Sequence, residues 1–142
     1  MRRSYKKVLT KNDTGETGGH QAGIAVPKKD EELLSFFPSL DPGRFNPDTW
    51  ITCVDPDGEE WDLRYVYYNG KTFDPPRSTR NEYRLTYMTK LFSKLGAKSG
   101  DSIVFTSTER KKYYKIRLES GFKKRSRSIA TPIVLKGWKP VF

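Results

Sequence analysis

Residues 80–87 read RNEYRLTY, and charged and apolar side chains alternate along this segment with a period of two. Because successive side chains of a β-strand point to opposite faces of a sheet, the segment predicts a strand with an apolar back and a charged front. The back consists of Tyr83, Leu85 and Tyr87. The front consists of Arg80, Glu82 and Arg84.

The charged front suits the edges of G·C base pairs. Arginine can donate two hydrogen bonds to guanine in the major groove, and glutamate can accept one from the exocyclic amine of cytosine. A solvated strand face can carry the same charges by chance. The segment on its own therefore leaves both interpretations open.

Turn signals divide the rest of the chain into short strands. The sequence Asp55-Pro56-Asp57-Gly58 predicts a hairpin between strands at 50–54 and 59–69. Asn69-Gly70 predicts another tight turn. Further strands are predicted at 5–10, 24–26, 102–107, 112–119 and 133–135, of which 102–107 and 112–119 form a second hairpin.

Two short helices interrupt the strands. Asp30 can cap a helix over 30–38, which Pro38 ends. Apolar residues at helical spacing from Met88 to Leu95, followed by Gly96, predict a second helix. We therefore expect a mainly β domain spanning residues 1–142, with roughly seven strands and two short helices in a barrel-like arrangement.

The charge of the chain points to a polyanionic partner. There are 27 lysines and arginines against 17 acidic residues, a net charge of +10. Nucleic acid and an anionic membrane surface both qualify, but the chain has neither a long apolar run nor a basic amphipathic helix, so we expect no membrane association.

Cysteine and histidine content limits the chemistry that the chain can perform. Cys53 and His20 are single copies, so an intrachain disulfide, a multi-cysteine zinc site and a histidine-rich metal site are excluded. Cys53 is predicted to be buried in a strand, and a reducing, cytoplasmic compartment is expected. No cofactor and no metal are expected.

Two segments together carry a family resemblance. Residues 14–27, with the run Gly18-Gly19-His20-Gln21-Ala22-Gly23, resemble the N-terminal effector-binding domain of EcoRII-like restriction endonucleases. Residues 80–84 resemble the second recognition segment of that domain. Residues 100–105 are similar to the late part of the related DNA-binding pseudobarrel of plant transcription factors.

The resemblance implies a seven-stranded DNA-binding pseudobarrel with two helices. Such a domain grips duplex DNA with an N-terminal and a C-terminal arm, both in the major groove, and binds a CC(A/T)GG-like site. The resemblance also implies a prokaryotic cytoplasmic protein, no catalytic residues in this chain and a fused C-terminal nuclease domain.

The resemblance also assigns residues by position. Bases would be read by His20, Gln21 and Ala25 of the N-terminal arm and by Ser78, Arg80, Glu82 and Arg84 of the C-terminal arm. DNA-backbone contacts are expected from residues near the arms: Lys11, Thr17, Lys28, Lys71, Arg77 and Asn81. The basic run at 123–127 is either a clamp on flanking DNA or an exposed loop.

Three alternatives remain. Asp101 with Glu109-Arg110-Lys111 fits the letters of a PD-(D/E)xK nuclease, but a strand between Asp101 and Glu109 would hold them roughly 25 Å apart. The basic charge also fits a non-specific nucleic-acid-binding module. The same fold could equally serve a stand-alone DNA-binding regulator.

Overall fold

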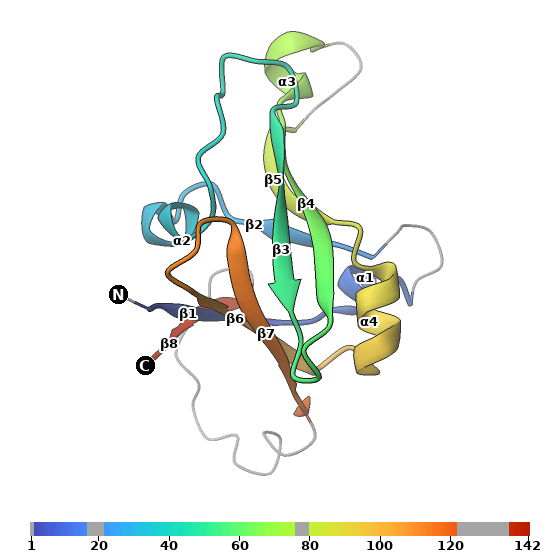
Figure 1. Cartoon of the computed structure of the whole chain (residues 1–142). Helices are drawn as coiled ribbons and strands as arrows, with labels where there is room; N and C mark the ends of the chain where they lie inside the picture. The colour runs from blue at the N-terminus through green and yellow to red at the C-terminus, as the bar shows by residue number, and fades with distance from the viewer. Residues whose placement is uncertain (1, 17–21, 76–79, 122–136) are drawn as a thin grey trace.

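The computed structural model describes residues 2–16, 22–75, 80–121 and 137–142 (Figure 1). Its strands are β1 (Ser4–Val8), β2 (Ile24–Val26), β3 (Asp48–Val54), β4 (Glu60–Tyr68), β5 (Glu82–Thr86), β6 (Ser102–Ser107), β7 (Tyr113–Glu119) and β8 (Trp138–Val141). Its helices are α1 (Lys11–Thr14), α2 (Glu31–Phe36), α3 (Gly70–Phe73) and α4 (Thr89–Leu95).

All eight strands belong to one curved sheet in the order β2-β5-β4-β3-β7-β6-β1-β8. Neighbours are antiparallel except β3 and β7, which pair in parallel. The sheet curls into a nearly closed barrel, with α2 at one side and α1 and α4 at the other (Figure 1). The indole Nε1 of Trp138 in β8 donates to the carbonyl oxygen of Ala25 in β2 at 2.8 Å, so a side chain connects the two outermost strands.

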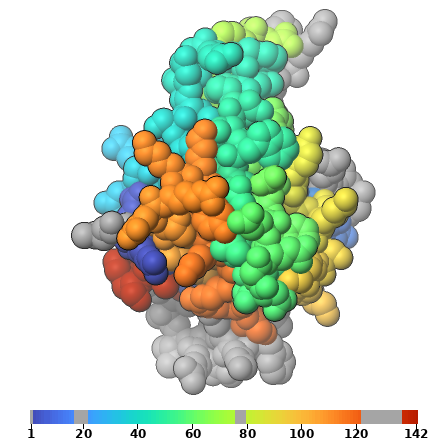
Figure 2. Space-filling model, viewed as in Figure 1, coloured from blue at the N-terminus to red at the C-terminus, as the bar shows by residue number. Residues whose placement is uncertain are grey.

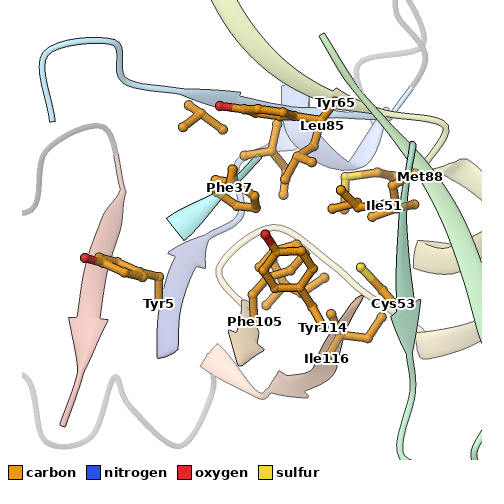
Figure 3. Close-up of a cluster of buried hydrophobic side chains, with 14 of the residues drawn as sticks. Tyr5, Phe37, Ile51, Cys53, Tyr65, Leu85, Met88, Phe105, Tyr114 and Ile116 are labelled. Carbon is orange, nitrogen blue, oxygen red and sulfur yellow. The ribbon is translucent and has the colours of Figure 1, made fainter. Parts of the chain in front are cut away.

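The apolar faces of these elements meet in one core. Phe37, just after α2, lies among the buried rings of this core (Figure 3). Its ring contacts those of Tyr65, Tyr114 and Trp138 at centroid distances of 5.1, 5.8 and 5.9 Å. Cys53 is fully buried, as its strand position predicts, and burial raises the pKa of its thiol.

The sequence prediction of a mainly β barrel is confirmed, and the described residues contain one strand more than the roughly seven expected. The additional strand is β8. Its sequence does not predict a strand, because Pro140 cannot donate a backbone hydrogen bond to a neighbouring strand. Proline is tolerated because β8 ends the strand order, where one side of its backbone needs no partner. The strand predicted at 133–135 lies outside the described residues.

Both predicted helices form, and two further short ones are present. Asp30 caps α2 by accepting from the amide of Leu33 at 3.1 Å, and Gly96 ends α4 in a left-handed conformation. The predicted tight turn at Asn69-Gly70 is wrong, because Gly70 begins α3. Asn69 is buried, and each of Asn69 and Asn46 accepts a hydrogen bond on its side-chain oxygen from the backbone amide of the other. These two bonds anchor the 41–47 loop, which protrudes above the barrel (Figure 2).

The end of the 80–87 strand also differs from the prediction. β5 ends at Thr86, and Tyr87 has a φ of 65° and is 60% exposed. The chain must turn there to enter α4, and this turn rotates Tyr87 out of the apolar back and against the ring of Trp50, with centroids 5.0 Å apart. The remaining members of the back behave as predicted, because Leu85 is fully buried and Tyr83 stacks on Tyr67 at 4.3 Å.

The predicted turn at 55–58 is confirmed, and the carboxylate of Asp55 organises it. This carboxylate accepts from the backbone amides of Asp57 and Glu59 at 2.9 and 3.0 Å. It also accepts from Trp61 Nε1 at 3.0 Å and Lys94 Nζ at 2.7 Å. The β3–β4 hairpin is thereby attached to α4.

We expect the stability of the domain to fall in acid, in part because of Asp55. The Lys94 hydrogen bond, with further ones from Trp61 and the backbone, holds the pKa of Asp55 well below its usual range. The unfolded chain therefore takes up the proton first, so this stabilisation is complete above about pH 5 and is lost as the pH falls towards the folded-state pKa. Thermal unfolding midpoints from about pH 7 to about pH 2 measure the loss, which should be smaller in Asp55→Asn. An identical pH profile in the variant would contradict this assignment.

Candidate nucleic-acid interface

The two predicted arms lead into neighbouring strands. β2 pairs antiparallel with β5, and Ala25 lies directly opposite Arg84. The approach is close, since a Cβ on Gly23 would lie 2.7 Å from the carbonyl oxygen of Leu85. A glycine is therefore required at position 23, where the chain enters β2 and passes close to β5. Because the pair is antiparallel, the segments that enter β2 and β5 do so at opposite ends of a two-stranded ribbon.

The charged front of β5 lines a concave surface. Arg80, Glu82 and Arg84 surround a hollow of about 370 Å³, which we call the recognition hollow. Its other lining residues are Asn12, Ala22, Gly23, Tyr68 and Thr86. The structure thus brings together three of the residues proposed to read bases, and Ala25 lies on the same face of the ribbon opposite Arg84.

The charged groups of the recognition hollow are exposed or half-buried. Arg84 Nη1 and Glu82 Oε1 lie 3.4 Å apart, and their side chains are 22% and 33% exposed. Arg80 is exposed and precedes the strand. A pair this long and this accessible can be exchanged for contacts to a ligand at small cost, because exposed ion pairs contribute at most about 1 kcal/mol.

The other residues predicted to contact DNA are placed in different ways. His20, Gln21, Ser78, Thr17 and Arg77 lie outside the described residues, as does the basic run at 123–127. Lys11 on α1, Lys28 after β2 and Lys71 on α3 are exposed. Asn81 is half-buried, and its amide nitrogen donates to Thr72 Oγ1 at 2.9 Å, so its side chain ties the start of β5 to α3.

Sequence reasoning missed several residues at this face. Tyr68 of β4 lies opposite Glu82, and Asn12 of α1 reaches the recognition hollow from another direction. Arg64 of β4 pairs with Asp48 at 2.6 Å, and this hydrogen bond raises the pKa of Arg64. Alternation along β4 is the signal that could have found Arg64 and Tyr68, because Leu63, Tyr65 and Tyr67 occupy the intervening positions and the first two are buried on the opposite face.

The residues of the nuclease-like motif serve the fold or lie apart. Asp101 precedes β6 and accepts from the backbone amides of Lys98 and Gly121, both at 3.0 Å. Glu109 follows the same strand at its other end. Within the described ranges, the structure contains no cluster of three or more histidine, cysteine or acidic residues that could hold a metal ion. None of the described helices has the length and apolar character needed to cross a bilayer.

Comparison with known proteins confirms the family resemblance. Residues 2–124 match the family described as "Restriction endonuclease EcoRII, N-terminal". The chain belongs to this family. It is also 41% identical over 85 residues to the type II restriction enzyme EcoRII of Escherichia coli. The match covers 58% of this chain but only 20% of that relative, so the chain corresponds to about a fifth of the relative's length.

A solved structure shares the fold of this member of the EcoRII N-terminal family. The chain in the Arabidopsis FUS3–DNA complex superposes with a TM-score of 0.59 and covers 81% of this chain and 94% of its own. The two sequences are 22% identical, so this likeness concerns the fold alone. It confirms the predicted class, a pseudobarrel of the plant transcription-factor kind.

Proposed function

We propose that this chain is a sequence-specific DNA-binding domain that holds a CC(A/T)GG-like duplex between two arms in the major groove. The observation that carries the proposal is the recognition hollow. It gathers Arg80, Glu82 and Arg84 on one open face, beside the strand that follows the N-terminal arm. The family membership and the net charge of +10 support the same function.

The geometry of β5 suits the reading of separate base pairs. Glu82 and Arg84 are alternate residues of one strand, so they project about 6.6 Å apart on the same face. This spacing corresponds to roughly two base steps at about 3.4 Å each. Arg80 and Arg84 would donate to guanines, and Glu82 would accept from the amine of a cytosine. A mixed-charge row of this kind supplies donors for guanine and an acceptor for cytosine, so it matches G·C pairs on both strands.

The two proposed arms would approach the DNA from opposite ends of the β2–β5 ribbon. The N-terminal arm enters the ribbon at one end and the C-terminal arm at the other, as the antiparallel register of β2 and β5 requires. His20 and Gln21 would read bases from the first arm and Ser78 from the second. Lys11, Lys28 and Lys71 are exposed and would contact phosphates, with Thr17 and Arg77 in the same role.

The proposal gives this domain recognition and not cleavage. A nuclease domain fused beyond this chain would cut the DNA, in a prokaryotic cytoplasmic enzyme of which residues 1–142 form the effector-binding domain. Incubation with plasmid and Mg²⁺ tests this division of labour. Metal-dependent cutting that disappears in Glu109→Ala would overturn it.

Selection from a random duplex pool tests the DNA-binding function directly, because it returns the preferred site. We expect CC(A/T)GG-like sequences. In a competition titration at fixed salt, the selected duplex should bind at least roughly a thousandfold more tightly than a scrambled one. Equal binding of both duplexes would mean a non-specific module instead.

Glu82→Gln should relax the choice of base at one cytosine. The amide keeps the size of the side chain but donates as well as accepts, so the preference for an amine donor weakens by about 1–3 kcal/mol. The ratio of dissociation constants between the selected duplex and its single-base-pair variants measures the change. Glu31→Gln, an exposed acid on α2, is the matched control. Unchanged ratios in Glu82→Gln would remove this residue from base readout.

A further inference from the structure

The turn between β6 and β7 carries a second concentration of positive charge. Arg110, Lys111 and Lys112 are consecutive and exposed. No ion pair to any of these three side chains forms among the residues that the structure describes. One acidic residue, Glu109, precedes them in the same turn. We call Arg110, Lys111 and Lys112 the turn surface.

The turn surface borders a hollow of about 450 Å³. The end of α2 forms one wall and the turn forms the other, and the two segments lie side by side (Figure 1). The guanidinium of Arg3 lies 5.6 Å above the ring of Phe36, which adds a fourth cation near this hollow. Figure 2 shows the β6–β7 region open on the front of the molecule.

The backbone of the turn is held in one conformation. Thr108 Oγ1 accepts from the amide of Arg110 at 3.2 Å and donates to the carbonyl oxygen of Tyr113 at 2.7 Å. The carbonyl of Lys112 accepts from the amide of Thr52 in β3 at 2.9 Å. Lys112 has a φ of 58°, a left-handed conformation that is costly for lysine and that concentrates at functional sites. The cations therefore project from a preorganised support.

The groups that remain accessible suit a phosphate backbone better than bases. Phe36 and Tyr114 are each only 4% exposed, so their rings are not available for stacking on a base. The ring of Tyr113 is occupied by the guanidinium of Arg110, 4.7 Å from its centroid. The exposed hydrogen-bond donors of the turn surface are all cationic. In the recognition hollow, by contrast, the carboxylate of Glu82 lies between Arg80 and Arg84. A surface of this kind neutralises phosphates and reads no sequence.

This surface is separate from the recognition hollow, because β4 and β3 lie between β5 and β7 in the sheet. We propose that it binds the sugar–phosphate backbone of a second duplex segment, without sequence preference. The domain would then contact two stretches of DNA at once. This inference does not depend on base reading by β5.

The test compares two variants that lose the same charge. The turn variant is Arg110→Gln/Lys111→Gln/Lys112→Asn, in which asparagine tolerates the left-handed backbone. The control variant is Lys29→Gln/Lys90→Gln/Lys98→Gln, three exposed lysines elsewhere. The probe is a 20-base-pair duplex (about two helical turns) of mixed sequence without CC(A/T)GG. Its dissociation constant is measured against salt concentration, and circular dichroism verifies folding.

We expect the turn variant to bind the probe roughly tenfold to a hundredfold more weakly than wild type. Its salt slope should be lower by about 2–3, since each phosphate contact contributes about 0.9. The control variant should keep the wild-type salt slope. Adding the turn substitutions to Arg80→Ala/Arg84→Ala should lower the slope by the same amount as adding them to the wild type. In the wild type, amide signals of residues 107–114 should shift when the probe is added.

Two results would overturn the inference. Equal slopes in the turn and control variants would mean that only net charge matters. Binding of polyglutamate that depends on the turn, without any such dependence for the duplex, would identify an acidic protein segment as the occupant.

Discussion

The double substitution Arg80→Ala/Arg84→Ala should weaken binding to the selected duplex by about 2–6 kcal/mol, because each arginine that reads a guanine contributes about 1–3 kcal/mol of discrimination. Both side chains line the recognition hollow. Arg80 is exposed and Arg84 is half-buried, and neither belongs to the apolar core, so their loss leaves the core intact. Fluorescence anisotropy with the selected and the scrambled duplex measures the effect, which should be far larger for the selected one.

Two further variants separate base readout from simple charge. Arg84→Lys keeps the positive charge but loses the planar fork, so it should lose base preference while the salt slope stays the same. Arg117→Ala removes an exposed arginine of β7 and should leave the preference unchanged. Loss of affinity for both duplexes in equal measure would mean that Arg80 and Arg84 contact phosphates only.

Lys7→Met should lower the free energy of unfolding by about 3–5 kcal/mol, because it leaves a buried carboxylate without its partner. Lys7 Nζ lies 2.7 Å from Asp13 Oδ2, and the two side chains are only 6% and 11% exposed. Asp13 Oδ2 also accepts from the amide of Thr10, which caps α1. Denaturant unfolding measures the loss, and Lys98→Met at an exposed site should have little effect.

A second substitution tests the physical cause. Asp13→Asn removes the buried charge but keeps an oxygen for the cap, so Lys7→Met/Asp13→Asn should recover part of the lost stability. DNA binding should follow stability at this site, because the carbonyl of Asp13 accepts from the amide of Gly23 at 2.9 Å and so holds together the two ends of the N-terminal arm. Additive losses in the double variant would mean that the two groups do not interact.

Sequence patterns predicted those strands and turns whose conformation depends on residues close in the sequence. Alternation along 80–87 predicted the two faces of the strand that the structure shows over 82–86, and the residues around Asp55 predicted the β3–β4 turn. Each result depends on neighbours in sequence, through side-chain alternation or hydrogen bonds within a few residues. Tyr87 shows the limit of this reasoning, because its conformation follows from the direction in which α4 leaves the strand.

The remaining features depend on how the elements pack against one another, which a single sequence does not reveal. Asn12 and Tyr68 reach the recognition hollow only because α1 and β4 both border β5 in space. In the sequence, Lys7 and Asp13 look like ordinary exposed charges. Only the packing of α1 against β1 shows that they form a buried ion pair. The sequence places Arg110 and Lys111 in a nuclease-like motif and Lys112 at the start of a strand, and it does not indicate the turn surface, since the neighbouring α2 lies far away in the sequence.

The hydrogen bond from the Trp138 indole to the carbonyl of Ala25 connects β8 directly to β2. Ala25 stands across from Arg84, so the last described strand is one hydrogen bond away from the ribbon that presents the charged row. Trp138 also packs against Phe37 in the core, so β8 is coupled to this ribbon both by the hydrogen bond and through the packed interior. Substitutions that displace β8 are therefore expected to shift the part of the sheet that carries Glu82 and Arg84 as well.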